Sequence, residues 1–178
     1  MAAGSSRRFG SDKRLAQLSN GETILAQTIN NIAAAGLEYK IAIAAKDQDL
    51  FSQLFAAEIL IIIEDSYQGM GQSIAEAIKN IKYNYQHCLI CLADMPYVLA
   101  STYQTIANSI DHYEAVIPHY NGSKGNPIAV SNALYERFSK LDGDKGGREL
   151  LKDKAINLHR LDVLDPGILR DIDTLADL

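Results

Sequence analysis

The chain has 178 residues, of which 47% are hydrophobic and 22% are charged, so it can build one sizeable core, and a single domain over residues 1–178 is expected. Its formal net charge of −5, with acidic and basic residues interspersed, argues against nucleic acid or an anionic membrane as a general partner. The N-terminus lacks the apolar segment of a secretory signal, and no apolar run is long enough to span a bilayer. Any phosphate binding must therefore come from a local site.

Apolar runs alternate with helical patterns along the chain. Strands are expected at 41–45, 58–63, 88–93, 115–118 and 127–130, with an edge strand at 158–163, and helices at 23–35, 48–57, 71–81, 101–110 and 132–140. This alternation favours βαβ units with right-handed crossovers, and hence a three-layer α/β/α domain around a mostly parallel sheet. Ligands of such sheets bind beyond the carboxyl ends of the strands, so functional residues are expected there.

The first candidate site is the glycine-rich and cationic segment at 4–13, with the sequence GSSRRFGSDK. Glycines let successive backbone N–H groups converge on one anion, arginine can fork onto a phosphate, and lysine supplies a compact charge. The spacing matches neither the Walker loop nor the dinucleotide-binding fingerprint. The segment is therefore interpreted as a phosphate loop of another kind, with a solvated basic N-terminus as the alternative.

Three aspartates are candidate metal ligands. Asp94 directly follows the predicted strand at 88–93, and Asp171 and Asp173 lie near the C-terminus. Magnesium takes one or two protein carboxylates together with substrate phosphate oxygens, so Asp94 and one C-terminal aspartate could hold it from two sides. Each aspartate could instead cap a helix or turn.

Two cysteines, Cys88 and Cys91, have the CxxC spacing of redox and zinc sites. They lie within an apolar run that predicts a buried strand, where residues three apart point to opposite faces. We therefore interpret both as buried core thiols, and their reduced state suggests a cytoplasmic protein.

Six segments resemble, in the family's order, the motifs of the molybdenum cofactor nucleotidyltransferases. They are 2–13 (AAGSSRRFGSDK), 69–74 (GMGQSI), 92–96 (LADMP), 125–127 (GNP), 143–148 (GDKGGR) and 171–174 (DIDT). The resemblance implies a Rossmann-like fold of the nucleotide-diphospho-sugar transferase type. It also implies Mg²⁺-dependent transfer of CMP or GMP, from CTP or GTP, to a molybdopterin-type acceptor with release of pyrophosphate.

Alanine at position 3, where guanylyltransferases tend to carry a second glycine, resembles the cytidylyltransferase branch. CTP is therefore the expected substrate. Two alternatives remain open: guanylyl or other nucleotidyl transfer to a sugar-phosphate or alcohol-phosphate acceptor, and a non-catalytic nucleotide-binding partner of a molybdoenzyme.

The resemblance also implies a role for each matching residue. Catalysis would involve Arg8, Lys13 and Asp94. The nucleotide site would comprise Ala3, Gly4, Ser5, Ser6, Arg8, Lys13, Gly71 and Ser73. The acceptor site would comprise Gly125, Asn126, Pro127 and Arg148, with an ordinary glycine turn as the alternative for 143–148. Asp94 would hold the metal together with Asp173 or Asp171.

The family places a full apolar strand before the phosphate loop, whereas here only Met1, Ala2 and Ala3 precede it. We therefore expect a truncated first strand. Neighbouring strands would then lack backbone partners over part of their length, and apolar surface would be left uncovered.

Overall fold

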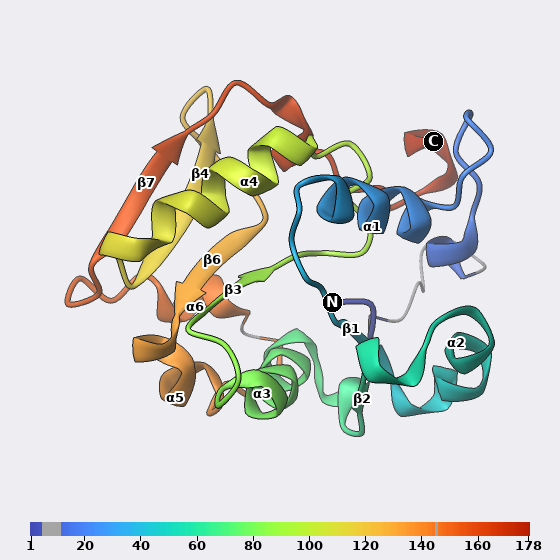
Figure 1. Cartoon of the computed structure of the whole chain (residues 1–178), viewed down its shortest axis with the longest axis horizontal. Helices are drawn as coiled ribbons and strands as arrows, with labels where there is room; N and C mark the ends of the chain where they lie inside the picture. Colours follow the sequence, from blue (N-terminus) through green and yellow to red (C-terminus); the bar gives the residue numbers. More distant parts are fainter. Residues whose placement is uncertain (5–11, 145) are drawn as a thin grey trace.

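The computed structural model describes residues 1–4, 12–144 and 146–178, which form a mixed α/β fold (Figure 1). The helices are α1 (Ile24–Ala34), α2 (Gln48–Leu54), α3 (Met70–Ile81), α4 (Ala100–Ser109), α5 (Tyr135–Phe138) and α6 (Gly147–Leu150). The strands are β1 (Ile41–Ala44), β2 (Leu60–Ile63), β3 (His87–Ile90), β4 (Ala115–Tyr120), β5 (Ser123–Lys124), β6 (Ile128–Ser131) and β7 (Leu158–Asp162). The predicted order of strands and helices is confirmed.

The strands pair in two groups. β1 pairs in parallel with β2, while the second sheet has the order β3-β6-β4-β5, with β7 parallel to β4. β6 runs antiparallel to both β3 and β4, so the sheet is more mixed than the alternating pattern predicts. The reason is the connection from β4 to β6, which contains a turn and the short β5 but no helix, whereas a parallel crossover needs about a dozen residues or more.

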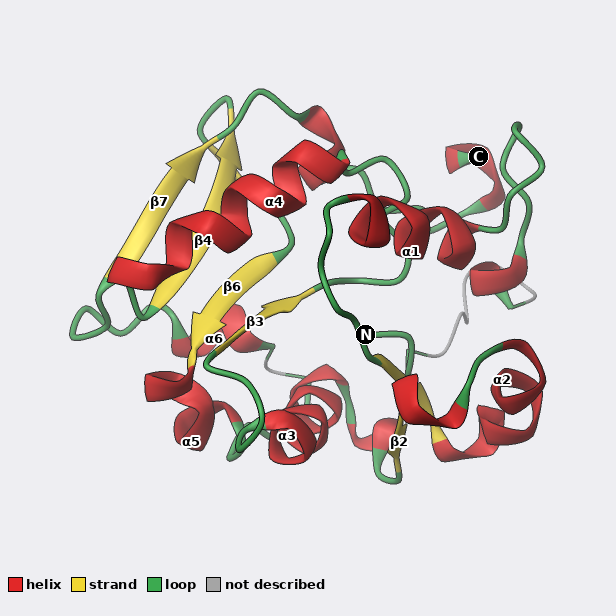
Figure 2. Cartoon of the chain, viewed as in Figure 1, coloured by secondary structure: helices red, strands yellow, loops and turns green. Residues whose placement is uncertain are grey.

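Helices cover both faces of the sheet, as the three-layer prediction requires (Figure 2). α1 and α4 lie on one side, and α3, α5 and α6 lie on the other. The largest core cluster packs Ile78 of α3 and Phe138 of α5 against Ile117 of β4 and Val130 of β6. All four of these side chains are buried, so this cluster fixes the α3 side of the sheet.

The N-terminal residues bridge the two groups of strands. The amide of Ala2 donates to the carbonyl of Ala42 in β1 at 2.8 Å, and the amide of Ala93, beyond β3, donates to the carbonyl of Met1 at 3.1 Å. The amine of Met1 donates to the carbonyl of Cys91 at 2.7 Å, and burial lowers its pKa. Figure 1 shows this end of the chain between β3 and β1.

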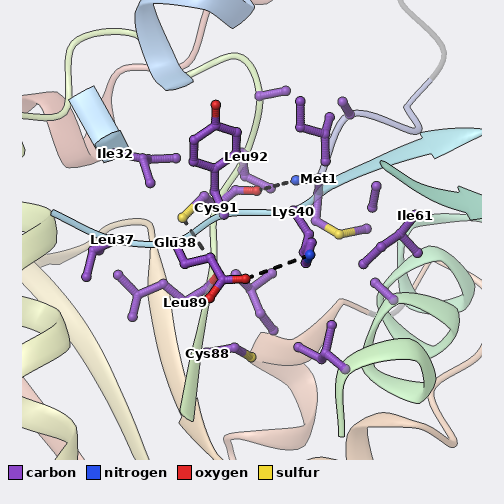
Figure 3. A pocket seen from close by; sticks show the side chains of 18 of the residues that line it. Met1, Ile32, Leu37, Glu38, Lys40, Ile61, Cys88, Leu89, Cys91 and Leu92 are labelled. Atoms are coloured by element: carbon purple, nitrogen blue, oxygen red, sulfur yellow. Dashed lines mark hydrogen bonds and ion pairs between the residues drawn. The ribbon is translucent and has the colours of Figure 1, made fainter. Parts of the chain in front are cut away.

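A cavity of about 380 Å³ continues from Met1 between the same two strands (Figure 3). Its walls are mostly apolar and come from both strands and from the helices on either face. They include Ile41 of β1, Leu89 of β3, Ile29 of α1 and Ile78 of α3. The expectation of a truncated first strand stays a prediction.

Cys88 and Cys91 are free thiols that line this cavity. Burial raises the pKa of each thiol to about 12, so both stay protonated and unreactive at neutral pH. This agrees with their interpretation as unreactive thiols, whereas full burial is not observed, because both are partly exposed and line the same cavity. In the described part of the chain, no helix is both long enough and apolar enough to cross a bilayer.

Candidate active site

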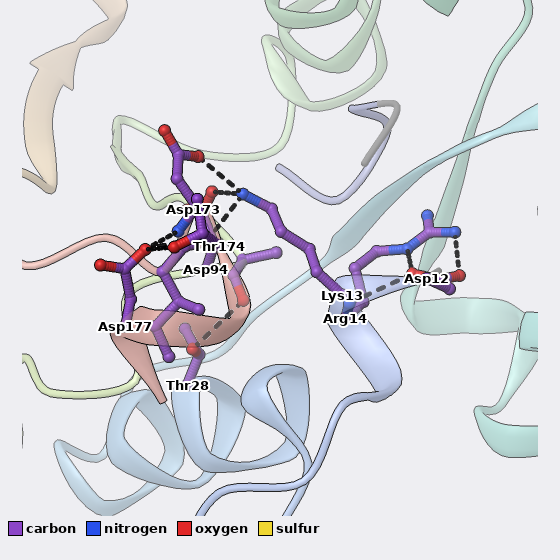
Figure 4. Close-up of polar contacts among 10 residues, drawn as sticks. Asp12, Lys13, Arg14, Thr28, Asp94, Asp173, Thr174 and Asp177 are labelled. Atoms are coloured by element: carbon purple, nitrogen blue, oxygen red, sulfur yellow. Dashed lines mark hydrogen bonds and ion pairs between the residues drawn. The ribbon is translucent and has the colours of Figure 1, made fainter. Parts of the chain in front are cut away.

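Three distant parts of the chain meet at the ammonium group of Lys13 (Figure 4). Its Nζ donates to Asp94 Oδ2 at 2.6 Å, to the carbonyl oxygen of Ile172 at 2.9 Å and to Asp173 Oδ1 at 3.2 Å. The Lys13 and Asp94 side chains are mostly buried, whereas Asp173 is about half exposed at 46%. The predicted phosphate loop, the end of the β3 segment and the C-terminal tail thus converge on one cluster.

Helix α1 fixes the segment that carries Asp94. Thr28 Oγ1 donates to the carbonyl of Ala93 at 3.3 Å, and Asn31 Nδ2 donates to the carbonyls of Pro96 and Val98, each at 2.9 Å. These side chains satisfy carbonyl groups in a loop without regular secondary structure, which holds its backbone in one conformation. α4 begins at Ala100 with Leu99 at its N-cap, so Asp94 does not cap that helix.

The C-terminal tail is anchored beside Asp94 by Ile172. The amide of Ile172 donates to the carbonyl of Asp94 at 2.9 Å, and its fully buried side chain packs with Leu18 and Ile24. The short helical turn that follows is capped by Thr174, with its backbone amide bound to the side chain of Asp177. The alternative in which Asp171 or Asp173 serves as this cap is therefore wrong.

The electrostatics favour a cation at this position. Burial by itself lowers the pKa of Lys13, but hydrogen bonds and charge interactions with Asp94 and Asp173 outweigh it, and the net pKa is raised. Asp94 Oδ1 is buried and has no hydrogen-bond partner within residues 1–4, 12–144 and 146–178. A carboxylate with a spare buried oxygen, a second carboxylate and a carbonyl form a donor set that fits a hard divalent cation.

No cluster of three or more histidine, cysteine, aspartate or glutamate side chains suited to a metal is found in the described ranges. Magnesium does not require one, because it usually retains waters and binds substrate phosphates besides one or two carboxylates.

Arg14, which the sequence analysis did not single out, clamps the two ends of the predicted phosphate loop. Its Nη1 donates to the carbonyl of Ala2 at 2.5 Å, before the loop, and its Nε donates to Asp12 Oδ1 at 2.7 Å, near the end of the loop. Its Nη2 pairs with Asp12 Oδ2 at 2.6 Å and with Asp47 Oδ2 at 2.8 Å, and the guanidinium lies 4.8 Å from the centroid of the Phe51 ring. The available sequence signal was a cation two residues after Asp12.

The middle of the loop, residues 5–11, lies outside the described residues, as does Lys145. The predicted roles of Ser5, Ser6 and Arg8 therefore stay predictions. At the edge of the loop, Ala3 is buried, whereas Gly4 is exposed.

The predicted nucleoside segment packs against the glycine-rich turn at 143–147. The amide of Gly71 donates to the carbonyl of Gly143 at 2.8 Å. Gly69 has a φ of +120°, and a Cβ at that position would collide with Gly143 and Asp144. Ser73 is buried and its hydroxyl donates to the carbonyl of Gly69 at 3.1 Å, so this hydroxyl could meet a nucleoside only as an acceptor.

The predicted acceptor residues also come together. Arg148 Nη2 donates to the carbonyl of Gly125 at 2.9 Å, and the amide of Asn126 donates to the carbonyl of Ile168 at 3.0 Å. Burial lowers the pKa of Arg148, and the charge of Asp171 acts in the opposite direction. Asp171 thus interacts electrostatically with Arg148, whereas Asp173 is the C-terminal aspartate that contacts Lys13.

An α/β sheet with Lys13 and two carboxylates converging beyond its strands has the arrangement typical of nucleotide-binding enzymes of the open-sheet class. The chain matches the model of the MobA-like NTP transferase domain over residues 1–161. It therefore belongs to this family of nucleotidyltransferases.

Individual relatives match this chain over nearly their full length. The chain is 25% identical to the purine catabolism protein PucB of Bacillus subtilis (strain 168), covering 98% of this chain and 89% of PucB. Rv0371c of Mycobacterium tuberculosis H37Rv superposes with a TM-score of 0.84 at 22% identity, covering 99% of this chain and 92% of Rv0371c. Rv0371c has also been solved in a complex with manganese, with a TM-score of 0.80, 22% identity and coverage of 98% and 91%.

Molybdopterin-guanine dinucleotide biosynthesis protein A of Archaeoglobus fulgidus superposes with a TM-score of 0.72 at 16% identity, covering 99% of this chain and 91% of that protein.

Proposed function

We propose that this protein transfers CMP from CTP to the phosphate group of a molybdopterin-type acceptor and releases pyrophosphate. The observation that carries the proposal is the meeting of Lys13, Asp94 and Asp173 beside the predicted phosphate loop. A cation from the loop and carboxylates from a strand end and the tail are the groups that bind a metal and a triphosphate together.

In this proposal Asp94 and Asp173 hold Mg²⁺, which when bound supplies positive charge that stabilises the phosphate oxygens of the transferring and leaving groups. Asp171 stays an alternative to Asp173, although its charge acts on Arg148. Support for a divalent cation comes from the buried free oxygen of Asp94 and from the manganese complex of Rv0371c.

The reaction is an in-line displacement at the α-phosphorus of CTP. An oxygen of the acceptor phosphate forms a bond to that phosphorus, the bond to the β-phosphate bridging oxygen breaks, and the electron pair leaves with pyrophosphate. The ammonium of Lys13 offsets the charge of the triphosphate, and Arg8 from the loop shares this role. No general base is required, because a phosphate acceptor is already ionised near neutral pH.

On the acceptor side, Gly125, Asn126, Pro127 and Arg148 are proposed to hold the anionic acceptor, since Arg148 is the cation among them and is exposed. The nucleoside is proposed to lie against Gly71 and Ser73. A cytoplasmic location, suggested by the two free cysteines, belongs to the same proposal.

Guanylyl transfer is the second candidate, because the Archaeoglobus fulgidus relative is a molybdopterin-guanine dinucleotide biosynthesis protein. The test is pyrophosphate release by the purified protein with Mg²⁺ and a molybdopterin-type acceptor, with CTP and GTP in parallel. Asp94→Asn, which retains the size of the side chain, serves as the site control.

Release with CTP that is lost in Asp94→Asn is the expected result. Release with GTP alone would overturn the choice of base. If the folded protein binds a triphosphate without releasing pyrophosphate, the non-catalytic partner of a molybdoenzyme becomes the better interpretation.

A further inference from the structure

The ammonium of Lys13 sits in the position of a bound cation. Its contacts with Asp94 Oδ2, the Ile172 carbonyl and Asp173 Oδ1 span 2.6–3.2 Å and come from two chain segments that are far apart in sequence. Figure 4 shows the lysine side chain extending from its own short helical turn to reach these oxygens. The oxygens suited to a divalent cation are thus already neutralised in part by the protein itself.

A divalent cation cannot bind these oxygens beside the Lys13 ammonium without a large electrostatic cost in free energy. A dication bound to Asp94 and Asp173 would lie within a few ångströms of the ammonium, and like charges at that distance in a partly buried site repel strongly. The side chains of Lys13 and Asp94 are only 16% and 21% exposed, so solvent screens this repulsion weakly.

We propose that Lys13 occupies the cation position in the nucleotide-free protein, and that a divalent cation binds Asp94 and Asp173 only when Lys13 moves away. The inference rests on the proposed function for what moves it, because the triphosphate is the anion that can attract the ammonium. Lys13 is the last residue of the predicted phosphate loop, so its long side chain can turn toward the rest of that loop while its helical turn stays in place. Metal binding then follows, or accompanies, nucleotide binding.

The experiment measures Mn²⁺ binding to nucleotide-free protein by electron paramagnetic resonance of the free ion. The wild-type protein is compared with Lys13→Met, which keeps the length of the side chain without its charge, and with Lys13→Arg, which keeps a cation. Lys140→Met is the matched control for losing one positive charge, because Lys140 is 72% exposed and far less buried than Lys13. Thermal unfolding of each variant establishes that it is folded.

Lys13→Met is expected to bind Mn²⁺ about ten- to a hundredfold more tightly than wild type, from removal of one nearby charge. Lys13→Arg and Lys140→Met are expected to stay near the wild-type affinity. Adding Asp94→Asn to Lys13→Met is expected to abolish the gain.

The proposal is overturned if Lys13→Met binds no more tightly than wild type, if neither protein binds Mn²⁺, or if the gain persists with Asp94→Asn. These outcomes are independent of turnover. A protein that shows the gain but releases no pyrophosphate from any nucleoside triphosphate would overturn the proposed function and leave the competition between Lys13 and the metal in place.

Discussion

Replacing Arg14 tests whether the clamp on the phosphate loop is a structural requirement. The Arg14 side chain is 8% exposed and pairs with Asp12 and Asp47, while its Nη1 binds the carbonyl of Ala2. Arg14→Met keeps the aliphatic stem over Phe51 but leaves both carboxylates without their cation. Removing one partner from a buried ion pair lowers the free energy of unfolding by about 3–5 kcal/mol. Because the Asp12 side chain is 29% exposed, the expected loss lies near the lower end, about 3 kcal/mol.

For a chain of this size, a loss of about 3 kcal/mol lowers Tm by about 6–12 °C. Differential scanning calorimetry of Arg14→Met measures this shift, and titration with CTP measures the expected fall in triphosphate affinity. Arg160→Met is the matched control, because Arg160 is 55% exposed and pairs with an exposed Asp162, so its loss should cost less than about 1 kcal/mol. Equal Tm values for the two variants would refute the reasoning.

Three further predictions follow from the same structure. Gly69→Ala should lower Tm by more than Gly122→Ala, because both glycines have positive φ but only the Cβ at position 69 would collide with backbone. The backbone strain alone is about 1–3 kcal/mol, and equal calorimetric shifts would contradict the packing. Burial raises the pKa of Asp12, but the hydrogen bonds and charge of Arg14 outweigh it, and the net pKa is lowered. The stability that Asp12 contributes should therefore be constant above about pH 4 and decline below it, as judged by the difference in Tm between wild type and Asp12→Asn across pH. An extension of four apolar β-branched residues before Met1 should fill the cavity beside β1 and β3. It should raise the free energy of unfolding by about 2 kcal/mol relative to a Gly-Ser extension of equal length. Equal Tm values for the two extended proteins would show that the cavity does not accept a strand.

Apolar periodicity was sufficient to predict the order of elements, because it is a local property of the chain. The resemblance implied that Lys13 and Asp94 belong to one site, whereas the hydrogen bond between their side chains was not predicted. It also predicted that a C-terminal aspartate returns to this site, and the tail anchored at Ile172 brings Asp173 to Lys13. The antiparallel direction of β6 was not predicted. The alternation of strands and helices favours parallel neighbours, but the connection from β4 to β6 is too short for a parallel crossover.

The residues missed at the site share one property, which is that they act on backbone carbonyls. Arg14 binds the carbonyl of Ala2, Thr28 that of Ala93, and Asn31 those of the loop after Asp94. The position of a carbonyl depends on how distant segments pack, so no local pattern marks the side chain that will satisfy it.

Met1 and Ala2, which bridge the two groups of strands, also form hydrogen bonds with residues beside the candidate active site. The carbonyl of Met1 accepts from Ala93, directly before Asp94, and the carbonyl of Ala2 accepts from Arg14, which also holds the far end of the phosphate loop. We therefore expect a change that orders Met1 and Ala2 to act on both the loop and the carboxylate without altering a ligand. Because preorganised groups bind with less loss of entropy, filling the cavity beside Met1 should tighten triphosphate binding as well as stabilise the fold.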